Sequence, residues 1–398
     1  MAAQTTIRIA VRKFGPFEDA VRRQFEDFAR REGVDAAMEF DALELNDLHT
    51  SLFERGGLRD GTYDIAFIVT DWLAAAVDDG LLADLSPLMR AHPLSDFPHA
   101  WSPSLTKMPQ FDGGLYGIAY HDGPECLIYR TDLVAAPPRT WDEFVATMQR
   151  VADPATNRYG TVIAAFPDGH NTIYDFCLHL WTRGGELLDA SGNPSLDTPA
   201  ARQALDFYRT LVRHPATVPD ARSIDSVAAG NRFMAGEVAM MANWFGFAAM
   251  CQTLENSAVR GKVGIAPIPA GAGAGGSSAS LNVYWLLALA AGSEHKEIAW
   301  RFMRHCASAE MDKLLTLAGA VGCRLSTWND AEVNERIPFF RQLPDLHENA
   351  RSFPVDRRFP ALAHAIERGV LRAIDSDDPV ETILRDVQRE AAAAWGNA

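Results

Sequence analysis

The sequence predicts an α/β fold with two lobes, joined by a hinge of several segments, with a ligand cleft between the lobes. Strands and helices alternate along the first half of the chain. A turn-rich stretch near residues 120–126 then separates two sheet-forming regions, and the chain returns to strand late, after residue 262. A chain that leaves one lobe, builds a second and comes back produces this architecture, which places ligands between the lobes.

The first half of the chain supplies the strand–helix rhythm. Residues 5–11 (TTIRIAV) predict a strand, and residues 17–33 carry apolar side chains at helical spacing up to a stop at Gly33. Residues 63–69 (YDIAFIV) form a near-continuous apolar strand, and a helix is predicted from near Trp72. This rhythm indicates a mostly parallel sheet covered on both faces.

The rest of the chain predicts a second set of elements. Residues 140–152 form a helix with a capping box, in which Thr140 is followed three residues later by Glu143. Strands are expected in 159–166, 262–269 and 282–290, and the tail from about Phe359 to Trp395 predicts two helices separated by SDDP.

These boundaries divide the chain into two lobes. We expect lobe 1 to comprise residues 1–121 and 270–320, and lobe 2 to comprise residues 122–269 and 321–398. The hinge is expected near 120–126, 264–270 and 318–326. The first of these crossings contains the sequence Asp122-Gly123-Pro124, which is typical of a turn.

Composition excludes several classes of function. The chain has 398 residues, 47% of them hydrophobic, and a formal net charge of −15. This negative charge argues against binding to nucleic acid or to an anionic membrane, because both require an excess of basic side chains. No apolar run is long enough to cross a membrane. The N-terminus reads directly into a strand, so either the protein is cytoplasmic or an export signal has been removed; we expect the second.

Motifs for cofactors, metals and catalysis are missing from the sequence. The five cysteines are odd in number and have no CxxC spacing, so we expect buried free thiols, with one disulfide left open. Gly271, Gly273 and Gly276 match G-x-G-x-x-G, but serines and a strand follow them instead of a helix, which indicates a connector. We expect no cofactor and no metal.

Polar and aromatic residues follow the ends of several predicted strands. Asp71 and Trp72 come directly after the apolar strand 63–69, at the edge where open α/β sheets bind ligands. The alternative is a turn in which Asp71 caps the next helix and Trp72 lies in the core. His170 and Asn171 are expected to open a helix, whose N–H groups can either meet ligand oxygens or simply be capped.

Several segments, in order and across most of the chain, resemble the family 1 extracellular solute-binding proteins of ABC importers, the maltose-binding-protein-like group. They include YDIAFIVTDWLAAAVDDGLLADLSPL, GLYGIAYHDGPECLIYRTDLV, NRFMAGEVAMMANW, KVGIAPIPAG and the stretch from WLLALAAGSEHKEIAW to GAVGCRLS. In that last segment Cys323 stands before Arg324, where the family usually has a nearby proline. The resemblance implies the type II periplasmic-binding-protein-like fold, a carbohydrate ligand, a membrane permease as partner, an extracytoplasmic location, a monomer and no catalysis.

A sugar presents C–H faces to aromatic rings and hydroxyls to planar polar groups. Trp244 matches a position at which the family commonly has a cleft aromatic, and alternation lets only one of Tyr284 and Trp285 face the ligand, with the resemblance favouring Trp285. Trp141, Trp181, Trp300 and Trp395 sit in helical patterns and are expected in the core. The candidate ligand-binding residues are Phe14, Asp71, Trp72, Tyr120, His121, Asp122, Glu125, His170, Asn171, Asn243, Trp244, Asn282, Trp285 and Arg324.

Two other functions remain open from the residues alone. Asp71, Asp122 and Glu125 beside tryptophans also suit a polyamine or another cationic solute, through ion pairs and cation–π contacts. Paired acids of this kind also serve a carbohydrate hydrolase, which is the less favoured alternative.

Overall fold

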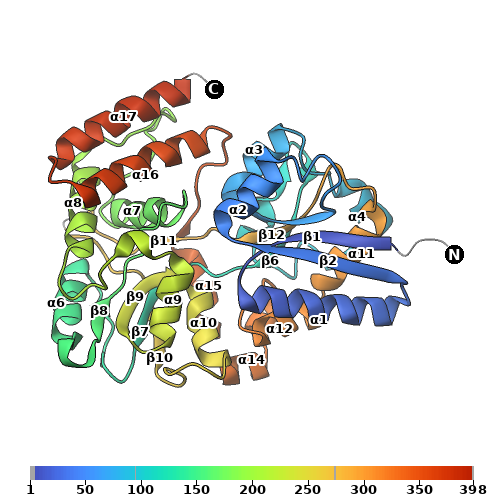
Figure 1. Ribbon diagram of the computed structural model, residues 1–398, viewed down its shortest axis with the longest axis horizontal. Helices are drawn as coiled ribbons and strands as arrows, with labels where there is room; N and C mark the ends of the chain where they lie inside the picture. Colours follow the sequence, from blue (N-terminus) through green and yellow to red (C-terminus); the bar gives the residue numbers. More distant parts are fainter. Residues whose placement is uncertain (1–4, 95, 273–274, 397–398) are drawn as a thin grey trace. The chain divides into compact units, whose positions relative to one another are not determined.

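The chain folds into two compact units. The computed structural model describes residues 5–94, 96–272 and 275–396 (Figure 1). Unit 1 consists of residues 1–123, 283–343 and 354–357, and unit 2 consists of residues 124–282, 344–353 and 358–398. The α/β class predicted from the sequence is confirmed, with one principal sheet in each unit.

The sheet of unit 1 has five strands in the order β2-β1-β3-β12-β6. Strand β1 (Thr5–Arg12) is parallel to β2 (Ala36–Leu43) and to β3 (Ile65–Val69). Strand β12 (Trp285–Leu289) enters antiparallel between β3 and β6 (Ile118–His121). A strand from late in the chain therefore completes a sheet that the first residues begin.

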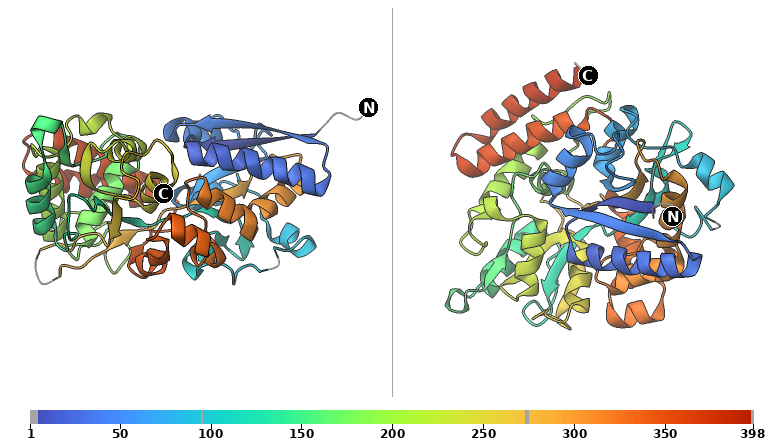
Figure 2. Two further views of the ribbon diagram at one scale, coloured as in Figure 1. Left: turned by 90° about the horizontal axis from the view of Figure 1, so that it is seen from below. Right: turned by 45° about the vertical axis from the view of Figure 1, so that its right-hand side comes forward.

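Helix α1 (Gly15–Glu32) shows why the N-terminal segment folds as predicted. It buries Phe17, Val21 and Phe28 on one face, and it ends where Gly33 takes the left-handed conformation at φ 61°. Helices α11 (Lys296–Cys306) and α12 (Ala309–Leu317) pack against α1 (Figure 2). Shorter elements of unit 1 are α2 (Leu45–His49), the π-helical turn Thr50–Glu54, the 3₁₀ turn Thr70–Trp72, α3 (Leu73–Asp78), α4 (Ser86–Ala91), α5 (Pro103–Lys107), β4 (Gln110–Phe111), β5 (Gly114–Leu115), α13 (Leu325–Trp328), α14 (Ala331–Arg336) and the 3₁₀ turn Phe340–Gln342.

The sheet of unit 2 has four strands in the order β10-β7-β9-β8. Strand β7 (Glu125–Arg130) is antiparallel to both β10 (Val263–Ala266) and β9 (Val238–Trp244), and only β8 (Tyr159–Thr161) pairs in parallel. The sheet of unit 2 is therefore mostly antiparallel, because long crossings of the chain bring β7, β9 and β10 together. The small strands β11 (Ser280–Leu281) and β13 (Ala350–Arg351) pair separately.

The helix predicted for residues 140–152 and the two predicted in the tail are present in unit 2. The capping box of α6 (Trp141–Val151) is present, since Thr140 Oγ1 accepts the Glu143 N–H at 3.2 Å. The other helical segments are the 3₁₀ turns Pro154–Thr156 and Ala221–Ser223, α7 (Asn171–Trp181), α8 (Pro199–Val212), α9 (Ser226–Met234), α10 (Phe245–Thr253), α16 (Phe359–Asp375) and α17 (Val380–Gly396), while α15 (Leu343–Glu348) spans a unit boundary. Helices α16 and α17 lie side by side, as predicted for the tail (Figures 1 and 2).

The observed unit boundaries lie further along the chain than the predicted lobe boundaries at two crossings. Residues 270–282 stay with unit 2, where Ser280 Oγ donates to the Glu125 carbonyl and β11 pairs with β13. Residues 321–343 stay with unit 1, where the Asp122 N–H donates to the Val321 carbonyl at 3.1 Å. Gly273, from the glycine-rich connector, lies outside the described residues.

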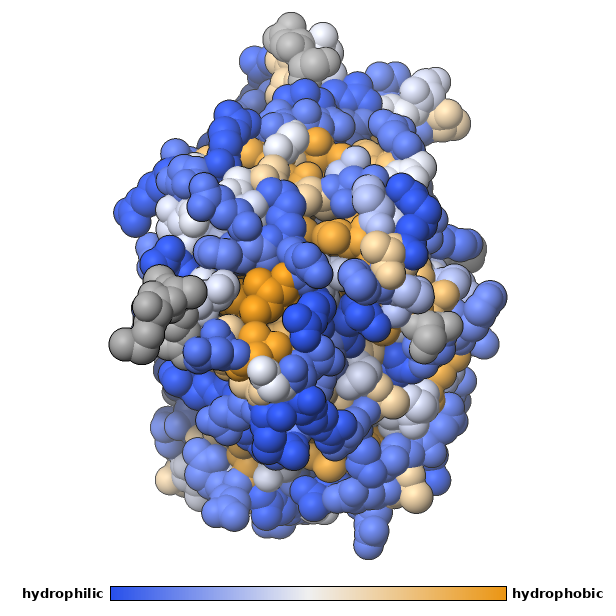
Figure 3. Space-filling view, turned by 90° about the vertical axis from the view of Figure 1, so that its right-hand side faces the viewer, coloured by the Kyte–Doolittle hydropathy of each residue, from blue (hydrophilic) through white to orange (hydrophobic). Residues whose placement is uncertain are grey.

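Burial agrees with the core that the sequence predicts. Trp141, Trp181, Trp300 and Trp395 are all buried. The five cysteines are buried free thiols, which confirms that expectation. In the part of the chain that the structure describes, no helix is long and apolar enough to span a membrane. Figure 3 shows one face of the protein, on which hydrophilic residues predominate and hydrophobic atoms gather only in small patches.

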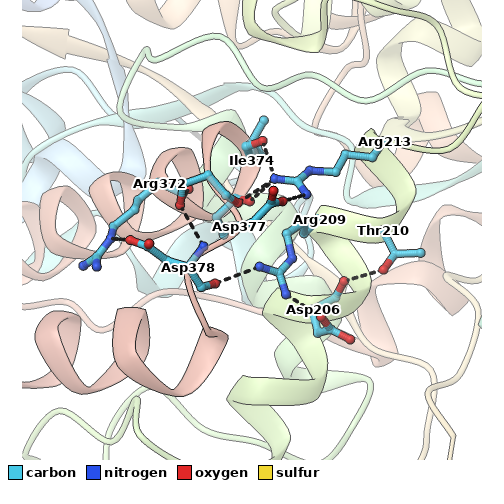
Figure 4. Close-up of polar contacts among 10 residues, drawn as sticks. Asp206, Arg209, Thr210, Arg213, Arg372, Ile374, Asp377 and Asp378 are labelled. Carbon is cyan, nitrogen blue, oxygen red and sulfur yellow. Dashed lines mark hydrogen bonds and ion pairs between the residues drawn. The ribbon is translucent and has the colours of Figure 1, made fainter.

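An arginine network attaches the last two helices to α8 (Figure 4). The Arg213 guanidinium donates to the Ile374 carbonyl at 3.1 Å and to the Ser376 carbonyl at 2.5 Å, and it pairs with Asp377 at 2.6 Å. Arg209 Nη1 donates to the Asp378 carbonyl at 2.9 Å. Because the last carbonyls of a helix lack partners within that helix, Arg213 satisfies the C-terminal end of α16.

We expect the Arg213→Met substitution to lower the free energy of unfolding by about 1 kcal/mol, because it removes partly exposed hydrogen bonds to helix carbonyls while keeping an apolar stem. Urea unfolding followed by circular dichroism measures the change. Arg385→Met, at an exposed position of α17, is the matched control. Equal stability of the two variants would contradict the assigned role.

Candidate functional site

Four aromatic side chains gather at one end of the sheet of unit 1, and we call them the unit 1 cluster: Phe14, Trp72, His121 and Trp285. In the sheet, Trp285 lies opposite Val69 on β3 and opposite His121 on β6. The Trp285 and Trp72 rings meet edge to face at 6.1 Å, and the Phe14 and His121 rings lie 6.4 Å apart. The end of β3, the end of β6 and the start of β12 therefore bring together residues that are far apart in the sequence.

His121 is held in one neutral form. Its Nδ1 accepts the Val321 N–H at 3.0 Å, and its ring packs against Phe17 at 4.8 Å. Burial lowers the pKa of His121 to about 4, against the opposing effect of the Asp122 carboxylate. Since Nδ1 is an acceptor in this contact, the proton of the neutral ring is on Nε2, which can donate a hydrogen bond to a solute.

The alternation predicted for the return strand is observed. Tyr284 is buried, and its phenol donates to the Ser104 carbonyl at 3.3 Å, whereas Trp285 is half-buried. Trp72 is buried and also contacts His49 at 5.2 Å, while Asp71 is half-buried in the 3₁₀ turn that follows β3. Helix α3 begins at Leu73, and its N-cap residue is Trp72.

Two candidate residues of unit 1 have other roles. The Tyr120 phenol donates to Gln24 Oε1 at 2.8 Å and its ring is buried, so Tyr120 joins the core beneath α1. The Arg324 guanidinium lies 4.4 Å from the centre of the Trp101 ring and donates to the Ala307 carbonyl at 2.8 Å. These contacts engage Arg324 inside unit 1, so we correct its assignment from ligand clamp to structural residue.

A second group of polar and aromatic residues, the unit 2 cluster, consists of Glu125, Tyr174, Trp244, Asn282 and Phe353. Glu125 begins β7 directly opposite Trp244 at the end of β9. Tyr174 on α7 meets Trp244 edge to face at 5.5 Å and stacks on Phe353 at 5.3 Å. Trp244 itself is half-buried.

The helix N-terminus at His170 and Asn171 is already occupied by a side chain. Helix α7 begins at Asn171 as predicted, but Asp168 Oδ1 accepts the N–H groups of His170 at 2.9 Å and Asn171 at 3.0 Å. The Asn171 side-chain amide also donates to Asp168. The expectation that these N–H groups meet ligand oxygens is therefore wrong, and the capping alternative holds.

The Asn243 side chain also makes hydrogen bonds within the fold. Its amide nitrogen donates to the Ser226 carbonyl at 3.1 Å, and its Oδ1 accepts the Trp244 N–H at 2.8 Å. These bonds fix the end of β9, so Asn243 positions the neighbouring Trp244.

Glu125 is a buried acid whose carboxyl group has no hydrogen-bond or ion-pair partner among the described residues. Burial, and then the charge of Asp175, raise the pKa of Glu125 well above its usual range. Burial also raises the pKa of Asp175 to about 8, and its only hydrogen bond among the described residues is a long one, 3.4 Å, from the Tyr208 phenol.

Sequence patterns did not single out several residues that the structure brings to this region. Asp168, Tyr174 and Asp175 belong to α7 or to the loop before it, and Phe353 follows β13. Phe166, in the same loop as Asp168, is 39% exposed. A single exposed phenylalanine is common on protein surfaces, so it gives no signal of a site.

Comparison with known proteins places the chain in a family. The family model described as bacterial extracellular solute-binding protein matches residues 17–313. The chain belongs to this family. This solute-binding protein is 26% identical over 367 residues to a probable ABC transporter-binding protein of Deinococcus radiodurans, covering 89% of this chain and 84% of the relative.

Two solved structures show the same fold. Maltose-bound MalE3 of T. maritima has a TM-score of 0.87 at 24% identity, covering 97% of this chain and 99% of that one. An ABC transporter solute-binding protein from Agrobacterium radiobacter K84 in complex with ribitol has a TM-score of 0.87 at 23% identity, covering 98% of each chain. The predicted periplasmic-binding-protein-like fold is thus confirmed.

We expect His121 to make the solute-binding protein less stable in mild acid. With a pKa of about 4 in the folded protein and 6.5 when unfolded, the unfolded state binds the extra proton between these values, so stability falls as pH drops from 6.5 to 4. His121→Asn keeps an acceptor for the Val321 N–H and removes this dependence. Urea unfolding at several pH values measures it, with exposed His364→Asn as control; parallel curves for the wild type and His121→Asn would contradict the assignment.

We expect Asp175 to change the stability of the protein with pH in the direction opposite to that of His121. Its pKa is raised from 3.8 to about 8, so the folded state binds the extra proton and stability falls as pH rises between these values. Asp175→Asn cannot ionise and is expected to gain stability relative to the wild type at pH 9 but not at pH 4. Thermal unfolding across this range measures the difference, and a gain that is independent of pH would contradict it.

Proposed function

We propose that this protein is the solute-binding component of an ABC importer and that it captures a sugar, polyol or sugar derivative. The observation that carries the proposal is the pairing of half-buried tryptophans with polar groups at strand ends in each unit. In unit 1, Trp285 lies opposite His121, and in unit 2, Trp244 lies opposite Glu125. Ring faces suit the C–H faces of a sugar, and the polar groups suit its hydroxyls.

The two clusters offer different hydrogen bonds. The neutral ring of His121 donates through Nε2, while Asn282 and Glu125 offer oxygen atoms. A hydroxyl both donates and accepts, so a polyhydroxylated solute can use both kinds of partner. Two solved structures with the same fold support this class of solute, since one is bound to maltose and the other is in complex with ribitol.

The mechanism we propose is binding without chemical transformation. A solute that contacts residues of both units favours the arrangement of the chain in which both clusters reach it, and a membrane permease can recognise that arrangement. The family of extracellular solute-binding proteins and the transporter-binding name of the Deinococcus relative support the permease as partner and an extracytoplasmic location.

A thermal-shift panel of sugars, polyols and sugar acids, including maltose and ribitol, tests this function, because a ligand that binds only the folded state raises the unfolding midpoint. For the solute that gives the largest shift, Trp244→Ala and Trp285→Ala are each expected to weaken binding at least about tenfold by calorimetry, which corresponds to about 1.4 kcal/mol. Tyr116→Ala, at a half-buried position beside the β4–β5 hairpin, is the control. Unchanged affinity in both tryptophan variants would contradict the proposed site.

A further inference from the structure

Two buried oxygen groups of unit 2 lack hydrogen-bond donors. The Glu125 side chain has no partner among the described residues although the residue is only 4% exposed. Asn282 is 3% exposed, and its Oδ1 also has no donor within the part of the chain that the structure describes. Buried acceptors are nearly always satisfied in folded proteins, so two such groups in one unit call for an external donor.

Backbone contacts bring these two groups to the same part of unit 2. Ser280 Oγ donates to the Glu125 carbonyl, and Asn282, two residues further on, donates its N–H to the Arg351 carbonyl at 2.8 Å. Segment 280–282 is therefore held beside the start of β7, where Glu125 lies opposite Trp244.

Several elements place titratable side chains around this region, and most of these side chains are acidic. Helix α7 contributes Asp175, the loop before it contributes Asp168 and His170, and α8 contributes the Tyr208 phenol. The charge of Arg351 acts on Cys177 of α7, and Arg351 pairs with Glu186 and lies over the Trp181 ring at 4.7 Å. Asp168 caps α7, and among the described residues no ion pair joins Glu125 or Asp175 to a basic side chain.

We propose that this part of unit 2 receives a primary ammonium group, so that the solute is an amino sugar or another amine-bearing polyol. The inference rests on the proposed function and narrows its substrate class. An ammonium offers three donors and a positive charge, which match the Glu125 carboxylate and Asn282 Oδ1, and the half-buried Trp244 ring adds a cation–π face. A hydroxyl offers one donor and no positive charge to balance an ionised carboxylate.

Proton exchange is expected to accompany binding. Burial raises the pKa of Asp175 to about 8 and raises the pKa of Glu125 well above its usual range, which favours the protonated form of both carboxyl groups when no solute is bound. When an ammonium binds, a carboxyl group ionises and its proton passes to the solvent. Binding of the amine therefore releases protons, whereas binding of a neutral sugar does not.

The test uses three matched sugars and one diamine with the full-length protein. Calorimetry at pH 7, in two buffers of different ionisation enthalpy, compares D-glucosamine, D-glucose, N-acetyl-D-glucosamine and 1,4-diaminobutane. We expect D-glucosamine to bind at least tenfold more tightly than the two neutral sugars, with release of protons. The diamine arm separates an amine-bearing sugar from a plain polyamine.

Substitutions test whether Glu125 and Asp175 cause the preference for D-glucosamine. Glu125→Gln keeps the shape and removes the charge, and it is expected to reduce the tenfold preference for D-glucosamine to less than threefold. Asp175→Asn is expected to reduce it in the same direction and serves as a second variant. Glu237→Gln, the same change at a surface carboxylate of unit 2 that pairs with Arg232, is the control and should leave the preference intact.

Each outcome decides the inference. Equal affinity for the three sugars, or a preference that survives both Glu125→Gln and Asp175→Asn, overturns the ammonium site but leaves carbohydrate binding in place. Binding of the diamine without any sugar supports the ammonium site and contradicts the carbohydrate function. Failure of both amines to bind overturns the inference.

Discussion

The insertion of β12 between β3 and β6 is the constraint on which the rest of the structure depends. Strand β12 pairs on both sides, so the sheet of unit 1 is complete only after the chain has left that unit and returned. The intervening residues form most of unit 2. The same pairing sets Trp285 beside His121 and next to the end of β3, so one strand both closes the sheet and builds the unit 1 cluster.

The two clusters differ in chemistry because their surroundings differ. In unit 1, burial keeps His121 neutral, and the Val321 N–H donates to its Nδ1, which leaves Nε2 as a hydrogen-bond donor. In unit 2, the buried Glu125 Oε2 and Asn282 Oδ1 have no hydrogen-bond partner among the described residues. The two clusters therefore differ in the hydrogen bonds that each can offer to a solute.

The sequence predicted the fold well because its signals are local or cumulative. The apolar spacing of α1, the glycine after it and the capping box of α6 each specify an element through neighbours a few residues away. Predictions for strand ends were less uniform. Trp244 and Trp285 lie half-buried at strand ends, but Tyr120 bonds to Gln24 and Arg324 stacks on Trp101, partners distant in the sequence.

The structure also decided cases that the sequence left open. At His170 and Asn171, ligand contact and helix capping fit equally well until Asp168 was seen to accept both N–H groups. In the sequence, Glu125 is one of several candidate acidic residues. In the structure it is distinguished by burial and by the lack of a hydrogen-bond partner for its Oε2 among the described residues. Composition and spacing do not report burial, so a residue of this kind becomes visible only in the folded protein.

A crystal structure of the complex with the solute that gives the largest thermal shift would test the central claim most directly. The account predicts a carbohydrate or polyol whose carbon skeleton contacts Trp244 and Trp285, with an atom of the solute within hydrogen-bond distance of Glu125. A solute bound away from both tryptophans would contradict the account, as would a chemical change in the solute within the crystal.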